Sequence, residues 1–211
     1  MGNATNITWH EGHVTRHIRE KLLDQKGCTI WFTGLPSSGK STLAFTLEHA
    51  LVERGRMAYV LDGDNIRHGL NKNLGFSSND REENIRRIGE VAKLFADAGL
   101  ICITSFISPY LVDRATARSL HESVGLRFIE VFVNTPVKVC EQRDPKGLYR
   151  LARQGGIKGF TGVDDPYEPP ATPELNVDTV HHTPEEIVQT ILEYLAAKAV
   201  LPSVSSEVGV G

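Results

Sequence analysis

The sequence predicts an α/β fold in which a five-stranded parallel sheet is flanked by helices. Five short runs are rich in apolar, β-branched and aromatic residues, and they lie at 28–33, 57–61, 100–106, 128–133 and 175–179. The segments between these runs carry helical spacing, and strands that alternate with helices are typical of a parallel sheet. The length of 211 residues suits one sizeable core. We therefore expect one main domain at 27–201, preceded by an arm at 1–26 and followed by a flexible tail at 202–211.

The arm at 1–26 contains a short amphipathic pattern. Its apolar residues are Ile7, Trp9, Val14, Ile18, Leu22 and Leu23, and the last four are close to helical spacing. This pattern predicts an extended arm and a short helix that packs on the main domain or on a second subunit. His13 and His17 are four residues apart, but no cysteine or carboxylate stands at ligand spacing, so a solvated helix face is favoured over a metal site.

The first strand is followed by a phosphate-binding motif. Residues 34–41 read Gly-Leu-Pro-Ser-Ser-Gly-Lys-Ser, which fits G-x-x-x-x-G-K-[ST], and a helical pattern with Leu43 and Leu47 follows. Such a loop aims backbone N–H groups at an anion from a helix N-terminus. Lys40 is expected to reach the β- and γ-phosphates, and the Ser41 hydroxyl to ligate Mg²⁺. A chance glycine-rich turn is the alternative, but the flanking strand and helix favour a P-loop NTPase fold.

The second and third strands end in polar residues. Asp62 and Asp64 follow the run at 57–61, and the carboxyl ends of parallel strands meet at one edge, beside the phosphate loop. Turn chemistry is the alternative for this pair, but function is favoured for Asp62. The third strand ends in Thr104 and Ser105, where many phosphate-loop enzymes carry a magnesium-directing aspartate. This assigns the carboxylate role to Asp62.

Capping patterns predict where the remaining helices begin. Asn79 and Glu82 have capping-box spacing and open a helix that ends at Gly99. Arg81 lies in its first turn, against the preference of the helix dipole, so it is a candidate ligand contact. Thr135 is expected to cap a helix with Pro136 in its first position, and the last helix begins with the capping box at 183–186.

Residues 144–173 interrupt the pattern of strands and helices. They contain five glycines, five prolines and four cations at Lys146, Arg150, Arg153 and Lys158. A long irregular segment inside a compact domain is usually a functional lid or is disordered. The basic content favours a mobile lid that closes over anions, and a solvated loop is the alternative.

Composition excludes several classes of protein. The net charge of −3 argues against a nucleic-acid surface, and no apolar run approaches the ~18 residues of a membrane span. The three cysteines, Cys28, Cys102 and Cys140, are scattered among apolar neighbours and predict reduced core thiols. The N-terminus is polar and has no secretory apolar core. We therefore expect a cytoplasmic protein with no membrane and no nucleic-acid partner.

An ordered set of motifs resembles the adenosine 5′-phosphosulfate (APS) kinases, also called adenylylsulfate kinases. The blocks lie at 34–42, 62–67, 69–71, 74–77, 81–87, 106–110, 143–149 and 160–162, and the resemblance covers roughly residues 5–201. It implies transfer of the γ-phosphoryl of ATP to the 3′-hydroxyl of APS, with Mg²⁺ and a homodimer. The motif set as a whole is far more specific than any one block.

The resemblance also implies roles for individual residues. The candidate catalytic residues are Lys40, Asp62 and Ser108, and the metal ligands are Ser41 and Asp62. The ATP-binding residues are Gly34, Ser37, Ser38, Gly39, Lys40, Ser41, Thr42 and Arg143. The substrate-binding residues are Asp62, Asp64, Arg67, Phe76, Arg81, Asn84, Ile107, Ser108, Lys146, Lys158 and Phe160. Arg67 and Arg81 match residues that hold the phosphosulfate, and Phe76 and Phe160 match aromatics on either side of the adenine.

Three alternatives compete with parts of this interpretation. A non-catalytic nucleotide-sensing module is disfavoured by the intact phosphate loop. A kinase for a sugar or a nucleoside monophosphate is disfavoured by the combination of Arg67, Phe76 and Arg81. Ser108 could form a phosphorylated intermediate, but no histidine or lysine is adjacent in sequence to activate it, so direct in-line transfer is favoured.

Overall fold

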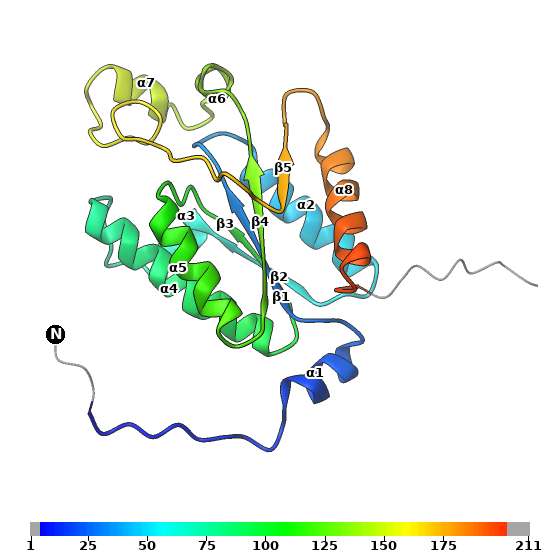
Figure 1. Ribbon diagram of the computed structural model, residues 1–211. Helices are drawn as coiled ribbons and strands as arrows, with labels where there is room; N and C mark the ends of the chain where they lie inside the picture. The colour runs from blue at the N-terminus through cyan, green and yellow to red at the C-terminus, as the bar shows by residue number, and fades with distance from the viewer. Residues whose placement is uncertain (1–4, 202–211) are drawn as a thin grey trace, which may run out of the picture.

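The computed structural model describes residues 5–201, and a five-stranded sheet forms the centre of the fold (Figure 1). Its strands, in spatial order, are β2 (Ala58–Asp62), β3 (Ile101–Ser105), β1 (Cys28–Thr33), β4 (Arg127–Val133) and β5 (Leu175–Val177). All four neighbouring pairs are parallel. The predicted α/β fold and its five strands are confirmed. Since β1 has β3 on one side and β4 on the other, its carboxyl end is the point at which doubly wound sheets bind ligands.

Helices cover both faces of the sheet (Figure 1). The helices α2 (Lys40–Glu53) and α8 (Pro184–Ala197) cover one face, and α4 (Ser78–Asp97) and α5 (Leu111–Glu122) cover the other. Leu47 and Ile191 lie in the core of the first face, and Trp31, Ile88 and Phe128 in the core of the second. Every residue of β1 is buried, as expected for a central strand with two covered faces.

Two predicted helix starts are wrong. The N-cap of α4 is Ser77, whose hydroxyl accepts a hydrogen bond from the Asp80 N–H at 3.2 Å, so Asn79 lies inside the helix. The helix α6 (Val137–Arg143) begins after Pro136, and Thr135 does not cap it. The Thr135 hydroxyl instead donates to the carbonyl of Ser38 at 3.1 Å, in the phosphate loop. The capping box at Thr183 is confirmed.

The segment at 144–173 is not irregular throughout, because it contains the short helix α7 (Leu148–Arg153). The Asp144 carboxylate accepts from the N–H groups of Tyr149 and Arg150 at 3.2 and 3.1 Å, which stabilises the helix start. Tyr149 is buried, and its hydroxyl donates to the Pro36 carbonyl at 3.1 Å. These contacts attach the segment to the phosphate loop.

The predicted N-terminal helix is present as α1 (Arg16–Leu23), but polar groups make much of its contact with the domain. Arg16 pairs with Asp97 at 3.0 Å and donates to the carbonyl of Val124 at 2.8 Å. Ile18 and Leu22 are 51% and 84% exposed, so the domain does not cover the predicted apolar face. The predicted tail at 202–211 lies outside the described residues.

Two expectations from composition can be compared with the described residues. Within residues 5–201 no helix combines the length and the apolar character that crossing a membrane requires. Cys28, Cys102 and Cys140 are buried free thiols, as the sequence predicts. Burial raises the pKa of the Cys28 thiol to about 12 and also raises the pKa of Cys140.

Candidate active site

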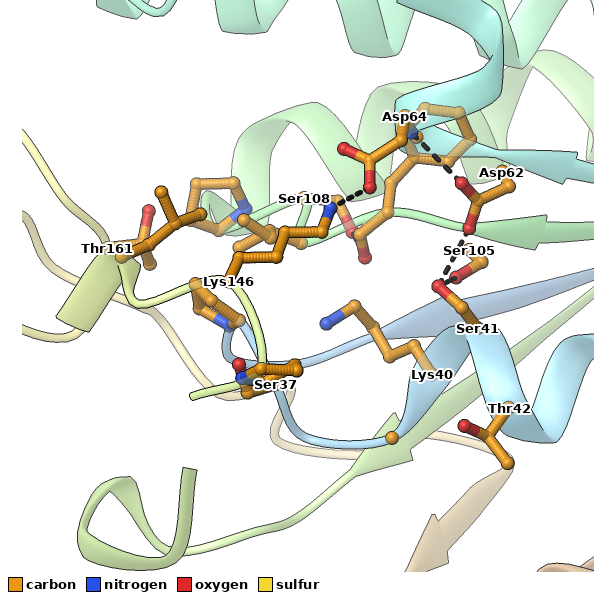
Figure 2. A pocket seen from close by; sticks show the side chains of 18 of the residues that line it. Ser37, Lys40, Ser41, Thr42, Asp62, Asp64, Ser105, Ser108, Lys146 and Thr161 are labelled. Carbon is orange, nitrogen blue, oxygen red and sulfur yellow. Dashed lines mark hydrogen bonds and ion pairs between the residues drawn. The ribbon is translucent and has the colours of Figure 1, made fainter. Parts of the chain in front are cut away.

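A cavity of about 1120 Å³ opens at the carboxyl edge of the sheet (Figure 2). Its walls are the phosphate loop and α2, the segment from β2 to the start of α4, the loop after β3, and the 144–173 segment. Arg143 at the end of α6 and residues between 179 and 187, around the start of α8, complete the lining. All the site residues predicted from the sequence line this cavity except Gly34 and Ser38. The fold therefore brings together side chains that the sequence spreads over more than a hundred positions.

The phosphate loop has the backbone shape that its glycines allow. Gly39 is the N-cap of α2 and has a φ of 101°, a conformation that favours glycine. A Cβ on Gly34 would lie 2.7 Å from the Val133 carbonyl oxygen. Ser38 is buried, and its carbonyl accepts from the hydroxyls of Thr135 and Thr179 at 3.1 and 3.0 Å. Ser38 thus supports the loop from behind, which explains why it does not line the cavity.

Lys40 is folded back onto this loop. Its Nζ donates to the carbonyls of Gly34 and Leu35 at 3.0 and 2.6 Å and to Ser38 Oγ at 3.3 Å. Burial lowers the pKa of the Lys40 ammonium to about 8. Its hydrogen-bond partners are all neutral groups. The geometry suits a bound anion that would supply the missing negative charge.

Side-chain oxygen atoms of Ser41, Asp62 and Ser105 lie close together beside the loop (Figure 2). The Ser41 hydroxyl donates to Asp62 Oδ2 at 2.7 Å and lies 3.2 Å from Ser105 Oγ. The other carboxylate oxygen of Asp62 accepts from the Asp64 N–H at 3.0 Å and caps the short helix α3 (Gly63–Arg67). Hard oxygen ligands of this kind suit Mg²⁺, which usually takes one or two carboxylates together with phosphates and water.

Arg67, at the end of α3, and Phe76 also line the cavity and pack against each other. The Arg67 guanidinium lies 4.3 Å from the centre of the Phe76 ring and donates to the carbonyls of Leu74 and Gly75 at 3.0 Å each. Phe76 is 71% exposed, so its ring remains available to a ligand. Asn84 is buried on α4, where its Oδ1 accepts from Asn71 Nδ2 at 2.9 Å.

Arg81 joins α4 to the 144–173 segment. Its guanidinium donates to the Thr161 hydroxyl at 2.9 Å, to Asp165 Oδ2 at 2.7 Å and to the carbonyl of Gly159. Asp165 also accepts from the Tyr110 hydroxyl at 3.2 Å. Arg81 lines the cavity as predicted, but in this structure its anionic partner is a carboxylate of the chain itself.

Other predicted residues of the segment and its surroundings also reach the cavity. Lys146 pairs with Asp64 across the opening, and Phe160 packs edge-on against Tyr149 with ring centres 5.0 Å apart. Lys158 is exposed on the cavity wall. Arg143 is held by Thr179, whose hydroxyl and carbonyl accept at 2.9 and 2.7 Å.

The sequence does not reveal Thr161, Asp165 or Thr179 as members of the site. Asp165 lies in the 144–173 segment, where the sequence pattern indicates cations as the functional groups, and Thr179 follows the short edge strand β5. Their partners, Arg81 and Arg143, are 84 and 36 residues away in the chain. Such contacts depend on tertiary structure, and no local spacing signals them.

Comparison with known proteins provides independent information. Residues 26–178 match the family model described as adenylylsulphate kinase. The adenylyl-sulfate kinase of Saccharomyces cerevisiae is 59% identical over 198 residues, covering 94% of this chain and 98% of that protein. The chloroplastic adenylyl-sulfate kinase 1 of Arabidopsis thaliana is 57% identical over 95% of this chain and 72% of its own. Among solved structures, the Mycobacterium tuberculosis APS kinase in complex with AMPPNP and APS has a TM-score of 0.79 and 50% identity, covering 81% of this chain and 98% of that one.

Proposed function

The chain belongs to the adenylyl-sulfate kinase family, and we propose that it transfers the γ-phosphoryl group of ATP to the 3′-hydroxyl of APS, which gives 3′-phosphoadenosine 5′-phosphosulfate. One observation carries this proposal. A phosphate loop and an acceptor side built from arginines and aromatic rings open into the same cavity. The related M. tuberculosis structure, which holds AMPPNP and APS together, supports the same pairing of substrates.

On the donor side, the phosphate loop would bind the triphosphate through its backbone N–H groups and Lys40. Lys40 already lies among loop carbonyls at the cavity wall, where it can neutralise charge on the β- and γ-phosphates. Ser41 and Asp62 would hold Mg²⁺, which supplies charge neutralisation to the phosphates when it is bound. Arg143 would lie beside the ATP base.

On the acceptor side, Phe76 and Phe160 would stack on the two faces of the adenine. Arg67, Arg81 and Asn84 would bind the phosphosulfate end, with Ile107 and Ser108 forming the loop beneath it. Lys146 and Lys158 would add positive charge from the lid. Asp62 would accept a hydrogen bond from the 3′-hydroxyl, and in a largely dissociative transfer this orientation matters more than basicity.

The test compares acceptors. ADP release is measured with APS, AMP, gluconate and shikimate at equal concentrations. We expect turnover with APS to exceed that with each of the others by at least about a hundredfold, because the arginine contacts are charge-assisted. Preferred turnover of gluconate or shikimate would show a different small-molecule kinase. Nucleotide binding without turnover of any acceptor would show a sensing module.

We also propose that the enzyme is a cytoplasmic homodimer. Ile7, Trp9, Ile18 and Leu22 are between 51% and 88% exposed, and an apolar surface of this kind is typical of an interface. The unpaired, buried thiols suit a reducing compartment. Light scattering of the purified chain should give twice the monomer mass. A Trp9→Ser/Leu22→Ser double variant should shift this mass toward the monomer, and an unchanged dimer would show that the interface lies elsewhere.

A further inference from the structure

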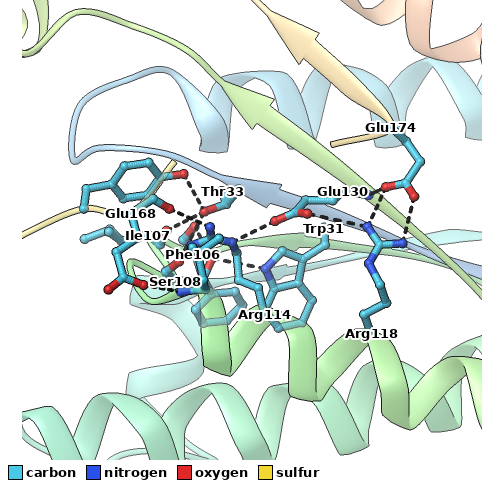
Figure 3. A network of polar contacts seen from close by, with 12 residues as sticks. Trp31, Thr33, Phe106, Ile107, Ser108, Arg114, Arg118, Glu130, Glu168 and Glu174 are labelled. Atoms are coloured by element: carbon cyan, nitrogen blue, oxygen red, sulfur yellow. Dashed lines mark hydrogen bonds and ion pairs between the residues drawn. The ribbon is translucent and has the colours of Figure 1, made fainter. Parts of the chain in front are cut away.

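Arg114 on α5 is a buried cation that contacts the loop after β3 (Figure 3). Its guanidinium donates to the Ser108 carbonyl at 2.6 Å, to the Glu168 carbonyl at 2.6 Å and to Glu130 Oε1 at 2.7 Å. The side chain of Arg114 is 2% exposed and that of Glu130 is 9% exposed. The three acceptors are served by three different nitrogens of one rigid, planar guanidinium, whereas the three donors of an ammonium all lie on a single nitrogen and do not reach the same spread positions.

The backbone at Ser108 needs support. Ser108 has a φ of 41°, in the left-handed region, which costs free energy for a residue with a side chain. Thr33 Oγ1 donates to the Ile107 carbonyl at 2.8 Å, and the Gly34 N–H donates to the same carbonyl at 3.4 Å. The acceptor loop is therefore tied to the phosphate loop on one side and to Arg114 on the other.

The end of the lid is attached to the same point. The Glu168 N–H donates to the Pro109 carbonyl at 2.9 Å, and the Glu168 carboxylate accepts from the Leu111 N–H at 2.6 Å. The Tyr167 hydroxyl lies 2.9 Å from Thr33 Oγ1. Arg114 links the loop after β3 to this segment, because its guanidinium donates hydrogen bonds to the carbonyls of both Ser108 and Glu168.

Arg118, one turn further along α5, provides a natural comparison (Figure 3). It also pairs with Glu130, at 3.5 Å, and it makes two hydrogen bonds to the Glu174 carboxylate at 2.7 Å each. Its remaining hydrogen bond goes to the Phe128 carbonyl. Arg118 therefore belongs to the same network of ion pairs. Its partners, however, lie on β4, directly before β5 and, for Glu122 at 3.7 Å, on α5 itself.

We propose that Arg114 is a positioning residue for the acceptor substrate. It holds the strained backbone of Ser108 against the acceptor half of the cavity and ties that loop to Glu168, near the end of the 144–173 segment. This inference rests on the proposed function, because it assigns the loop after β3 to the acceptor rather than to ATP. It predicts that loss of Arg114 affects binding of APS selectively.

The test uses Arg114→Met, Arg114→Lys and the matched control Arg118→Met in the full chain. KM for APS, KM for ATP, kcat and the melting temperature are measured for each. For Arg114→Met we expect KM for APS to rise by about tenfold or more, since two charge-assisted bonds to the loop and lid are lost, with KM for ATP within about twofold. Arg114→Lys keeps a charge beside Glu130 but not the three-way contact, so a rise of about threefold to tenfold is expected.

Arg118→Met should lower the melting temperature about as much as Arg114→Met does, because each change removes an arginine that pairs with a carboxylate of the same network. It should leave both KM values within about twofold of the parent. Three results would overturn the inference: an unchanged KM for APS in both Arg114 variants, an equal rise for both nucleotides, or the same selective rise in Arg118→Met. If Arg114→Met does not fold, the Arg114→Lys variant decides. Absence of wild-type turnover with APS would instead overturn the proposed function, and the inference with it.

Discussion

The two halves of the cavity are built in different ways. On the donor side, Lys40 and Ser41 are the first two residues of α2, directly after the phosphate loop, and Asp62 joins them by a 2.7 Å hydrogen bond from Ser41. These groups are held by backbone and by neighbouring strand ends. On the acceptor side, Phe76 is 71% exposed and Arg81 is held by a segment about eighty residues away. The donor half is therefore held by local structure, whereas Arg81 of the acceptor half depends on its contacts with the 144–173 segment.

The largest loss is expected for Lys40→Ala in the donor half. This change removes the cation that we propose contacts the transferring phosphoryl group, and a preorganised donor of this kind is worth about 10²–10³ in rate. The melting temperature should not fall, because the Lys40 ammonium is destabilised by burial in the free chain. Turnover is followed by coupled ADP release. Activity above a few per cent of the parent, with normal melting, would contradict the kinase mechanism.

Asp62→Asn tests the second donor-side group. The amide oxygen can still accept from the Asp64 N–H and cap α3, so the local fold should be retained. The negative charge that we propose for the acceptor hydroxyl and Mg²⁺ is lost. We expect kcat to fall by about a hundredfold with nucleotide still bound. Asp62→Ala, which also loses the cap, should be less stable than Asp62→Asn. Equal melting temperatures and normal kcat in the Asn variant would limit Asp62 to its capping role.

Arg81→Ala tests the dependence of the acceptor half on the lid. The change removes the predicted phosphosulfate contact and the bonds to Thr161 and Asp165. We expect KM for APS to rise by roughly ten- to a hundredfold, with little change for ATP. Isothermal titration with each nucleotide separates the two effects. An equal loss for both nucleotides would assign Arg81 a structural role in lid attachment.

The pH dependence of nucleotide binding tests whether the donor half is preformed. The pKa of Lys40 is lowered to about 8 in the free chain, and a bound triphosphate would raise it again. Binding should therefore take up a proton above about pH 8, and affinity should fall by up to about tenfold per pH unit as pH rises from there toward the pKa of the complex. Calorimetry in buffers of different ionisation enthalpy measures this uptake. The same proton uptake in Lys40→Met would assign it to another group.

The same contrast explains what could be predicted from sequence. The phosphate loop and the five strands were predictable, because their signals lie within a few residues of one another. The start of α4 was predicted two residues late, because Ser77 and Asn79 both have capping side chains and the sequence does not rank them. The helix α7 is six residues long and lies among glycines, so no periodicity revealed it. Asp165 and Arg114 were missed because their partners are brought close only by the complete fold.

Ser108→Ala should produce the smallest effect, because the acceptor loop uses the backbone of this residue more than its hydroxyl. Ser108 is 2% exposed, and its Oγ accepts from Trp31 Nε1 at 3.1 Å and donates to the Phe106 carbonyl at 3.5 Å. Neither partner can remove its proton, so the hydroxyl lacks the adjacent base that a nucleophilic serine requires. The Ser108 carbonyl, which Arg114 holds, is unchanged by the substitution.

We therefore expect Ser108→Ala to lower turnover by no more than about fivefold, the value of one neutral hydrogen bond. The stereochemistry of transfer gives the decisive measurement. With a chiral γ-phosphate, direct in-line transfer inverts the configuration at phosphorus, whereas a phosphoserine would require two transfers and retain it. Inversion together with an active Ser108→Ala enzyme would show a single direct transfer from ATP to the acceptor hydroxyl. Retention of the configuration would instead indicate a phosphoserine intermediate at Ser108, and the Ser108→Ala variant would then have to be inactive.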